Sequence, residues 1–299
     1  RQVSTPTNIG RVSGFGWSMG YFGGIVLLLL CYVGFIAGDG DTRGLLGLTT
    51  DDGLNIRLVA LLAAVWFAVS AIPVLLSVPE LPATGVDSGA AKAGLVESYR
   101  VLFRDLRQLW VTDRRSVWFL GASALFRDGL NGVFTFGAII AAVVFRFSPA
   151  EVLYFAVAAN VGAGIGTFIG GWLDDRLGAK NVIIGSLIGL VLAGSAVLFI
   201  GDSKTGFWIA GLFLTLFVGP VQAASRSFLA RITPPGREGE IFGLYATTGR
   251  AVSFLAPGLF TLIVGLTADT RFGIIGIVLV LLGGLALMIP VKAKQEVID

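Results

Sequence analysis

Three ionisable residues lie deep inside apolar segments of this 299-residue sequence. Arg127 and Asp128 are adjacent, about 11 residues from the charged end of one segment, and Arg250 lies about ten residues into a later segment. Charge is costly in the middle of a bilayer, so such residues mark either a solute pathway or a structural pair. Arg127 or Arg250 could bind a carboxylate, and Asp128 could take up a coupling proton.

The alternative is a structural role, in which Asp128 and Arg250 form an ion pair across the bundle and hold the helices in register. Adjacent helical positions point about 100° apart, so Arg127 and Asp128 cannot both face one partner. Asp128 is the only carboxylate deep in any apolar segment, and the sequence contains no histidine. A proton-coupled cycle confined to these segments would therefore use Asp128, and Asp128→Asn should abolish transport driven by a pH gradient.

Uncharged polar residues lie at similar depths. Asn131 is one turn from Arg127, Asn160 is in the middle of the next segment, and Gln222 lies further along the chain. We expect these three residues to bind solute together with the arginines. The alternative is that they form hydrogen bonds between helices, as polar groups in bilayers often do.

Composition identifies the kind of protein that must position these side chains. The hydrophobic fraction is 55% and the charged fraction 14%, whereas a soluble domain carries about 25% charge. Because the apolar runs are long and do not alternate, they predict membrane-spanning helices and not barrel strands. The absence of histidine excludes serine–histidine catalysis and histidine-bound zinc, and the single cysteine, Cys31, excludes an intramolecular disulfide. We expect no enzyme activity, no cofactor, no metal site and no nucleic-acid partner.

Eight apolar runs are long enough to cross a bilayer, which takes about 20 helical residues. They are Phe15–Ala37, Ile56–Val78, Val117–Phe145, Ala150–Trp172, Val182–Ile200, Phe207–Leu229, Ile241–Leu266 and Phe272–Pro290. Between the second and third runs, 79–115 reads as a linker that ends in an amphipathic helix suited to the headgroup region. The expected organisation is two spans in 1–78, a cytoplasmic linker in 79–115 and six spans in 116–299.

The distribution of Lys and Arg orients the spans, because cytoplasmic loops are rich in both. Fifteen of the 22 fall on the side that holds both chain ends, the linker and the turn after Trp172, and five fall on the other side. We therefore expect both ends of the chain to be cytoplasmic.

The turn between the fourth and fifth spans carries a recognisable motif. The stretch from Gly171 to Lys180 reads Gly-Trp-Leu-Asp-Asp-Arg-Leu-Gly-Ala-Lys. It resembles the cytoplasmic signature of the major facilitator superfamily, with Ala179 where a basic residue is usual. The resemblance implies a gating role for Gly171, Asp175, Arg176, Gly178 and Lys180. Asp175 could cap a neighbouring helix, or pair with Arg176, Lys180 or an arginine of the sixth span.

Further stretches narrow the resemblance to one branch. Arg11–Gly24, Phe126–Gly129, Gly219–Arg226 and Gly243–Arg250 resemble, in order, the vacuole-effluxer-like family, named for a fungal vacuolar amino-acid effluxer and with many bacterial members. This resemblance implies an all-α major facilitator fold, with these spans as helices five to twelve of twelve. It implies a monomeric secondary transporter that exports amino acids or similar small solutes from the bacterial plasma membrane, with protons as the candidate coupling ion.

Glycine recurs every four residues in two spans, as Gly16, Gly20 and Gly24 and as Gly162, Gly166 and Gly170. Such stripes let helix backbones approach closely. The superfamily places these two spans opposite each other, so we expect the stripes to form contacts between the two halves of the transporter. Static packing is the alternative.

Other functions remain open at this point. The chain could export a different solute class, such as drugs or sugars. It could also be a scaffold or receptor built on a transporter fold, although a scaffold gains little from buried charge.

Overall fold

The computed structural model describes residues 4–78, 95–234 and 236–291. Eight helical segments in these ranges are long and apolar enough to cross a membrane. They coincide with the eight predicted spans and confirm an all-α, multi-pass membrane protein. Most of the predicted linker, 79–94, lies outside the described residues.

The chain forms two compact units. One contains 1–19 and 88–299, and the other contains 20–87. The division therefore falls inside the first helix, α1 (Ile9–Cys31), whereas the predicted domain boundary lies at residue 78.

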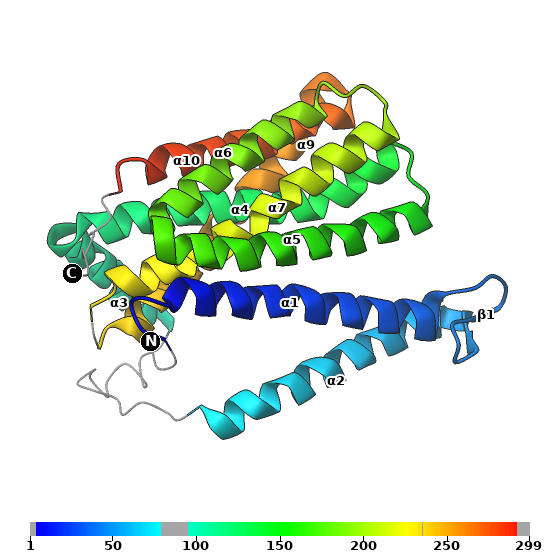
Figure 1. Ribbon diagram of the computed structural model, residues 1–299, viewed down its shortest axis with the longest axis horizontal. Helices are drawn as coiled ribbons and strands as arrows, with labels where there is room; N and C mark the ends of the chain where they lie inside the picture. The colour runs from blue at the N-terminus through cyan, green and yellow to red at the C-terminus, as the bar shows by residue number, and fades with distance from the viewer. Residues whose placement is uncertain (1–3, 79–94, 235, 292–299) are drawn as a thin grey trace. The chain divides into compact units, whose positions relative to one another are not determined.

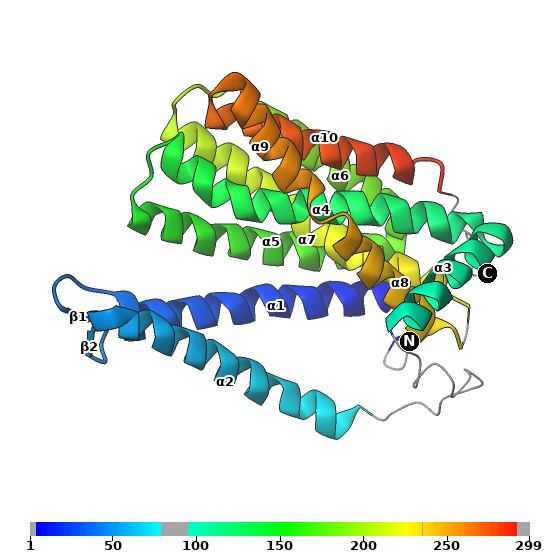
Figure 2. The ribbon, with the colours of Figure 1, turned by 180° about the vertical axis from the view of Figure 1, so that it is seen from behind.

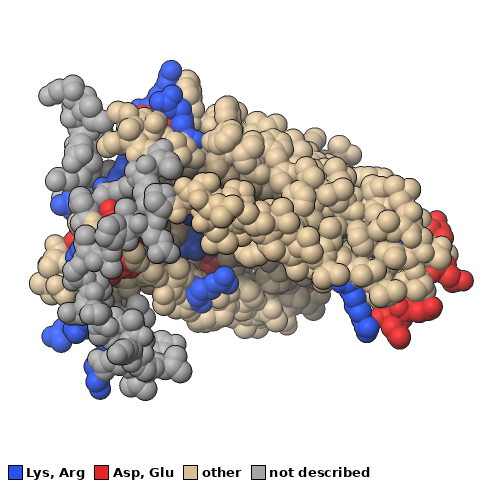
Figure 3. All heavy atoms as spheres, turned by 90° about the horizontal axis from the view of Figure 1, so that it is seen from below, with Lys and Arg blue, Asp and Glu red and all other residues tan. Residues whose placement is uncertain are grey.

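The smaller unit is a pair of helices joined by a short hairpin. From Tyr32 to Ile36 the end of α1 is π-helical (η1), and β1 (Thr42–Arg43) then pairs antiparallel with β2 (Leu48–Thr49). A short turn of 3-10 helix, η2 (Asp51–Gly53), leads into α2 (Leu54–Ser77). The loop is acidic, with four exposed carboxylates: Asp39, Asp41, Asp51 and Asp52. Acidic side chains are drawn in red in the space-filling view (Figure 3).

The larger unit holds the other six spans and the amphipathic helix. Its helices are α3 (Leu95–Thr112), α4 (Arg114–Val143), α5 (Pro149–Leu177), α6 (Ala179–Val197), α7 (Lys204–Ile232), α8 (Glu238–Ala251), α9 (Leu255–Thr267) and α10 (Gly273–Met288), with a 3-10 turn, η4 (Thr270–Phe272), before α10. Helices α5, α6 and α7 pack on one another, and α10 packs on α4, α6 and α9 (Figures 1 and 2). The buried faces of these helices form one apolar core.

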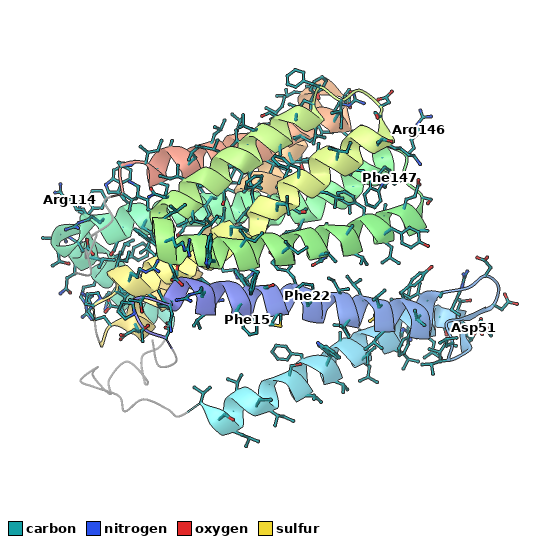
Figure 4. All side chains as sticks on the ribbon, in the orientation of Figure 1. Phe15, Phe22, Asp51, Arg114, Arg146 and Phe147 are labelled. Atoms are coloured by element: carbon teal, nitrogen blue, oxygen red, sulfur yellow. The ribbon has the colours of Figure 1, made fainter. Side chains whose placement is uncertain are left out.

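Polar caps mark where spans begin. The Asp113 carboxylate accepts hydrogen bonds from the backbone N–H groups of Arg115 and Ser116 at the start of α4. Ser148 and Glu151 form a capping box at the start of α5, which satisfies two backbone donors that the helix leaves free. Arg114 and Arg146 lie at opposite ends of α4, so the apolar length of this helix runs between two charged ends (Figure 4).

The seventh predicted span is not one helix, which corrects the prediction for Ile241–Leu266. Helix α8 ends at Ala251 and α9 begins at Leu255, so three residues interrupt the span. Pro257 lies in the first turn of α9. A proline ring clashes with the carbonyl four residues earlier in a continuous helix but is tolerated in a first turn. A helix can therefore start just before Pro257 but cannot easily run through it.

Candidate functional site

Asp175 joins the end of α5 to the start of α1. Its carboxylate accepts hydrogen bonds from the backbone N–H of Gly10 at 2.8 Å and of Arg11 at 3.0 Å. It also accepts one from the Arg11 Nε at 2.9 Å. A carboxylate is favourable at a helix N-terminus, because the first N–H groups lack partners and carry partial positive charge. Asp175 thus caps a neighbouring helix, as predicted.

Arg231, in the last turn of α7, bonds both carboxylates of the turn. One of its terminal nitrogens pairs with Asp174 and the other lies 3.3 Å from Asp175. The Ser227 hydroxyl, one turn earlier in α7, also donates to Asp174. The Asp174 side chain is 1% exposed. A buried carboxylate needs such partners because its charge has left water. We call Asp174, Asp175, Ser227, Arg231 and the start of α1 the charged cluster.

The other predicted gating residues lie around this cluster. Gly171 is buried, and a Cβ added there would lie 2.7 Å from the Gly10 carbonyl oxygen. Gly178 has a φ of +84° between α5 and α6, a conformation that favours glycine. The Lys180 ammonium donates to the Ile289 carbonyl after α10, at 2.8 Å. Arg176 is exposed and stacks on Trp172, with 3.8 Å between its guanidinium carbon and the ring centroid.

The glycine stripe of α5 faces α7, which corrects the prediction that Gly162, Gly166 and Gly170 form contacts between halves. A Cβ on Gly162 would lie 2.8 Å from the Thr215 hydroxyl. A Cβ on Gly166 would overlap the Leu216 carbonyl, and one on Gly170 would lie 2.6 Å from the Pro220 side chain. The stripe therefore brings two neighbouring helices of the six-span part together.

The start of α1 meets α5 through a different stripe from the predicted one. A Cβ on Gly14 would lie 2.8 Å from the Gly171 Cα, and the Ser18 hydroxyl donates to the Gly164 carbonyl at 2.9 Å. Gly16 is exposed, and a Cβ there would meet nothing within 4 Å. Two positions along a helix turn the side chain by about 200°, so Gly16 does not lie on the face of α1 that meets α5. Gly20 and Gly24 belong to the smaller unit, and their packing stays a prediction.

Arg127 lies against the second half of α8. One terminal nitrogen donates to the Tyr245 carbonyl at 2.8 Å, and the guanidinium carbon lies 4.0 Å from the centroid of the Tyr245 ring. The Tyr245 hydroxyl in turn bonds the Ser225 hydroxyl of α7 at 2.8 Å. Arg127 is therefore engaged by protein groups.

Asp128 lies against the other side of the break in span seven. Its side chain is buried, and its carboxylate accepts a 2.6 Å hydrogen bond from the Ala256 N–H in the first turn of α9. The predicted pairing of Asp128 with Arg250 is wrong within the described part of the chain. The backbone of α9 takes the place of the arginine.

Arg250 and Asn131 are both exposed, Arg250 in the last turn of α8 and Asn131 on α4. Gln222 is half-buried on α7. No hydrogen bond or ion pair of the Arg250 side chain occurs among the described residues. The Arg250 side chain is therefore exposed, whereas the guanidinium of Arg127 is bound by groups of α8.

Asn160 lines an apolar cavity of about 140 Å³ whose walls come from α4, α5, α6, α7 and α10. Phe155, Phe207 and Leu214 are among its apolar lining residues, and Thr215 supplies a second polar group. The amide nitrogen of Asn160 donates to the Ala156 carbonyl of its own helix at 2.8 Å. Asn160 thus lies on a cavity within the bundle, apart from Arg127 and Arg250.

Reasoning from sequence predicted an arginine of the sixth span as a partner of Asp175 but did not single out Arg231, and it gave no role to Asp174 or Ser227. A usable signal was present, because Ser227 and Arg231 are four residues apart at the charged end of the sixth span and so share a helix face. Asp174 and Asp175 are adjacent, so their side chains leave the helix in different directions. Each carboxylate therefore needs partners of its own.

Comparison with known proteins places these features in a family. The model of "Vacuole effluxer Atg22 like" proteins matches residues 4–298. The chain is 25% identical to autophagy-related protein 22-1 of Neosartorya fischeri, over 95% of this chain and 48% of that protein. It is 26% identical to autophagy-related protein 22 of Cryptococcus neoformans, over 96% of this chain and 50% of that protein.

A bacterial relative carries the name of the wider superfamily. The chain is 20% identical to an uncharacterized MFS-type transporter, YxiO, of Bacillus subtilis, over 99% of this chain and 67% of that protein. The chain spans about half the length of the fungal relatives it matches.

Proposed function

Because this chain belongs to the vacuole effluxer Atg22-like family, we propose that it supplies helices of a secondary transporter that exports amino acids or similar small solutes. Transporters of the major facilitator superfamily bind solute near the bilayer midplane and expose it alternately to the two sides. The activity of the whole protein and the identity of its solute are part of this proposal.

The charged cluster is the observation that carries the proposal. Alternating access requires one end of the helix bundle to close and reopen. At this end, Asp174, Asp175 and Arg231 join α5, α7 and the start of α1 through hydrogen bonds and ion pairs. Such contacts can break and re-form as units when helices move, which makes the cluster a suitable lock for one side of the transporter.

The solute site is proposed from depth and exposure. Arg250 lies within the seventh span, is exposed and is free of protein partners among the described residues. A guanidinium binds carboxylates with two parallel hydrogen bonds. Arg250 is therefore the proposed anchor for a solute carboxylate, with Asn131 and Gln222 as further polar contacts.

The proposed setting is a bacterial plasma membrane with the charged cluster in the cytoplasm. The excess of Lys and Arg on the side of the cluster supports this orientation. The printed names of the fungal relatives refer to vacuoles and autophagy. A vacuolar membrane is therefore the alternative setting.

A counterflow experiment tests the proposal. The protein, expressed from its full reading frame and reconstituted in vesicles loaded with unlabelled amino acids, should accumulate a mixture of radiolabelled amino acids. Free amino acids should compete for uptake, whereas their methyl esters, which lack the carboxylate, should not. Arg250→Gln should remove this difference, because the anchor for the carboxylate is lost. Failure to exchange any amino acid, drug or sugar would favour a scaffold instead.

A further inference from the structure

The break in span seven places two helix ends inside the membrane. The last carbonyls of α8 and the first N–H groups of α9 lack the hydrogen-bond partners that a continuous helix would give them. Hydrocarbon cannot supply these partners, so protein groups must do so. In this chain two adjacent residues of α4 lie against the two sides of the break. Asp128 supplies such a partner to the first turn of α9. Arg127 binds a carbonyl within α8, that of Tyr245, six residues before the helix ends.

Arg127 serves the α8 side. Besides its hydrogen bond to the Tyr245 carbonyl, its guanidinium lies along the last turns of the helix, because a Cβ on Gly249 would come within 2.7 Å of it. The absence of a side chain at Gly249 therefore lets a cation rest on the backbone. The C-terminal part of a helix carries partial negative charge, so a cation is favourable there.

Asp128 serves the α9 side with the opposite charge. Its carboxylate binds the Ala256 N–H, where the helix carries partial positive charge. The fit around this contact is close, since a Cβ on Gly132, one turn further along α4, would lie 3.1 Å from the Ala256 Cβ. The two half-helices also have different main neighbours, because α8 packs mainly on α4 and α9 mainly on α10.

We propose that Arg127 and Asp128 are positioning residues that hold the two half-helices of span seven and so fix the place of Arg250. Arg250 follows Gly249 directly and lies one residue before the end of α8. Its position is therefore set by the contact that Arg127 makes with the same turn. The proposal rests on the proposed role of Arg250 in binding solute. It gives Arg127 and Asp128 a different role from solute binding and proton coupling.

We call the contacts of Arg127 with α8 and of Asp128 with α9 the clamp. Distance measurements between spin labels test the clamp without any solute. Labels on Gly243→Cys in α8 and Leu262→Cys in α9 report on the break, since a Cβ at Gly243 meets nothing within 4 Å and Leu262 is exposed. The background is Cys31→Ala, which removes the one cysteine of this 299-residue sequence. Labels on Tyr154→Cys and Phe168→Cys, both exposed on the unbroken α5, provide the matched control pair.

Two substitutions at Asp128 separate its hydrogen bond from its charge. Asp128→Asn keeps an oxygen that can accept the Ala256 N–H, whereas Asp128→Leu has a similar size and no acceptor. We expect Asp128→Leu and Arg127→Met to broaden the α8–α9 distance distribution and Asp128→Asn to restore a narrow one. The control pair on α5 should be unchanged in all variants. In the counterflow assay, Arg127→Met should raise the KM for amino acids about tenfold with little change in Vmax, because binding energy is lost without loss of turnover.

Other outcomes overturn the clamp. A narrow α8–α9 distribution in both Asp128→Leu and Arg127→Met would show that neither residue holds the break. If Asp128→Asn abolished exchange driven by a pH gradient while the distances stayed unchanged, Asp128 would be the coupling residue instead. If the distances changed as expected but no solute exchanged in any assay, the clamp would stand and the proposed function would fail.

Discussion

Arg231 is the residue of the charged cluster that pairs with both of its carboxylates. It pairs with two carboxylates whose side chains are 1% and 6% exposed, and it is itself 27% exposed. Removing one partner of a buried ion pair leaves the other charge unpaired, which costs far more than the pair contributes. Arg231 therefore stabilises the end of α5, where the negative charges of Asp174 and Asp175 would otherwise repel each other.

Arg231→Met should lower the free energy of unfolding in detergent by about 3 kcal/mol, because Asp174 loses its cation while staying buried. Titration with a denaturing detergent, followed by circular dichroism, measures the change. Arg176→Met is the matched control from the same turn, since it loses only stacking on Trp172 and should cost less than about 1 kcal/mol. Equal effects of the two substitutions would contradict the role given to Arg231.

Residue roles could be predicted from the sequence only in part. The motif pointed to Asp175 and to an arginine of the sixth span, and both lie in the cluster. The depth of Arg127 and Asp128 was also evident from the apolar flanks. Their partners were not, because both bind backbone groups, and a backbone carbonyl or N–H leaves no mark in the sequence.

At the scale of elements, hydropathy predicted where helices run but not which way their faces point. A stripe of glycines defines one face of a helix but does not tell which neighbouring helix that face meets. A shift of one residue changes the direction of the side chain by about 100°. The stripe at Gly162, Gly166 and Gly170 was real, yet its partner was α7. The break at 252–254 escaped notice because both half-helices are apolar, although Pro257 was a visible signal.

Gly166→Ala should lower the free energy of unfolding by about 1–3 kcal/mol, because its methyl group would overlap the Leu216 carbonyl and force α5 from α7. Gly16→Ala introduces the same methyl group where nothing lies within 4 Å. It should leave stability unchanged or raise it by up to about 1 kcal/mol, because alanine favours a helix over glycine. Both values come from the detergent titration described above. A Gly166→Ala variant as stable as Gly16→Ala would mean that α5 and α7 are not in close contact.

At the scale of the whole molecule, the proposed orientation rests on the uneven distribution of Lys and Arg. Helix α4 offers a direct check, because Arg114 and Arg146 lie at its opposite ends (Figure 4). In the Cys31→Ala background, a membrane-impermeant maleimide applied to intact cells should label Arg146→Cys but not Arg114→Cys. Opening the cells should make Arg114→Cys reactive. Labelling of Arg114→Cys alone in intact cells would reverse the orientation.

The contacts of α5 have a consequence for how the protein folds as it is made. Ser18 and Gly164, which join α1 to α5, are 146 positions apart. The glycines of α5 gain most of their packing only when α7 has been synthesised, because Thr215, Leu216 and Pro220 are their neighbours. Contacts so distant in sequence form slowly. The six-span part therefore does not assemble one helical hairpin at a time during translation. Helix α5 reaches its final packing only after α7 has entered the membrane.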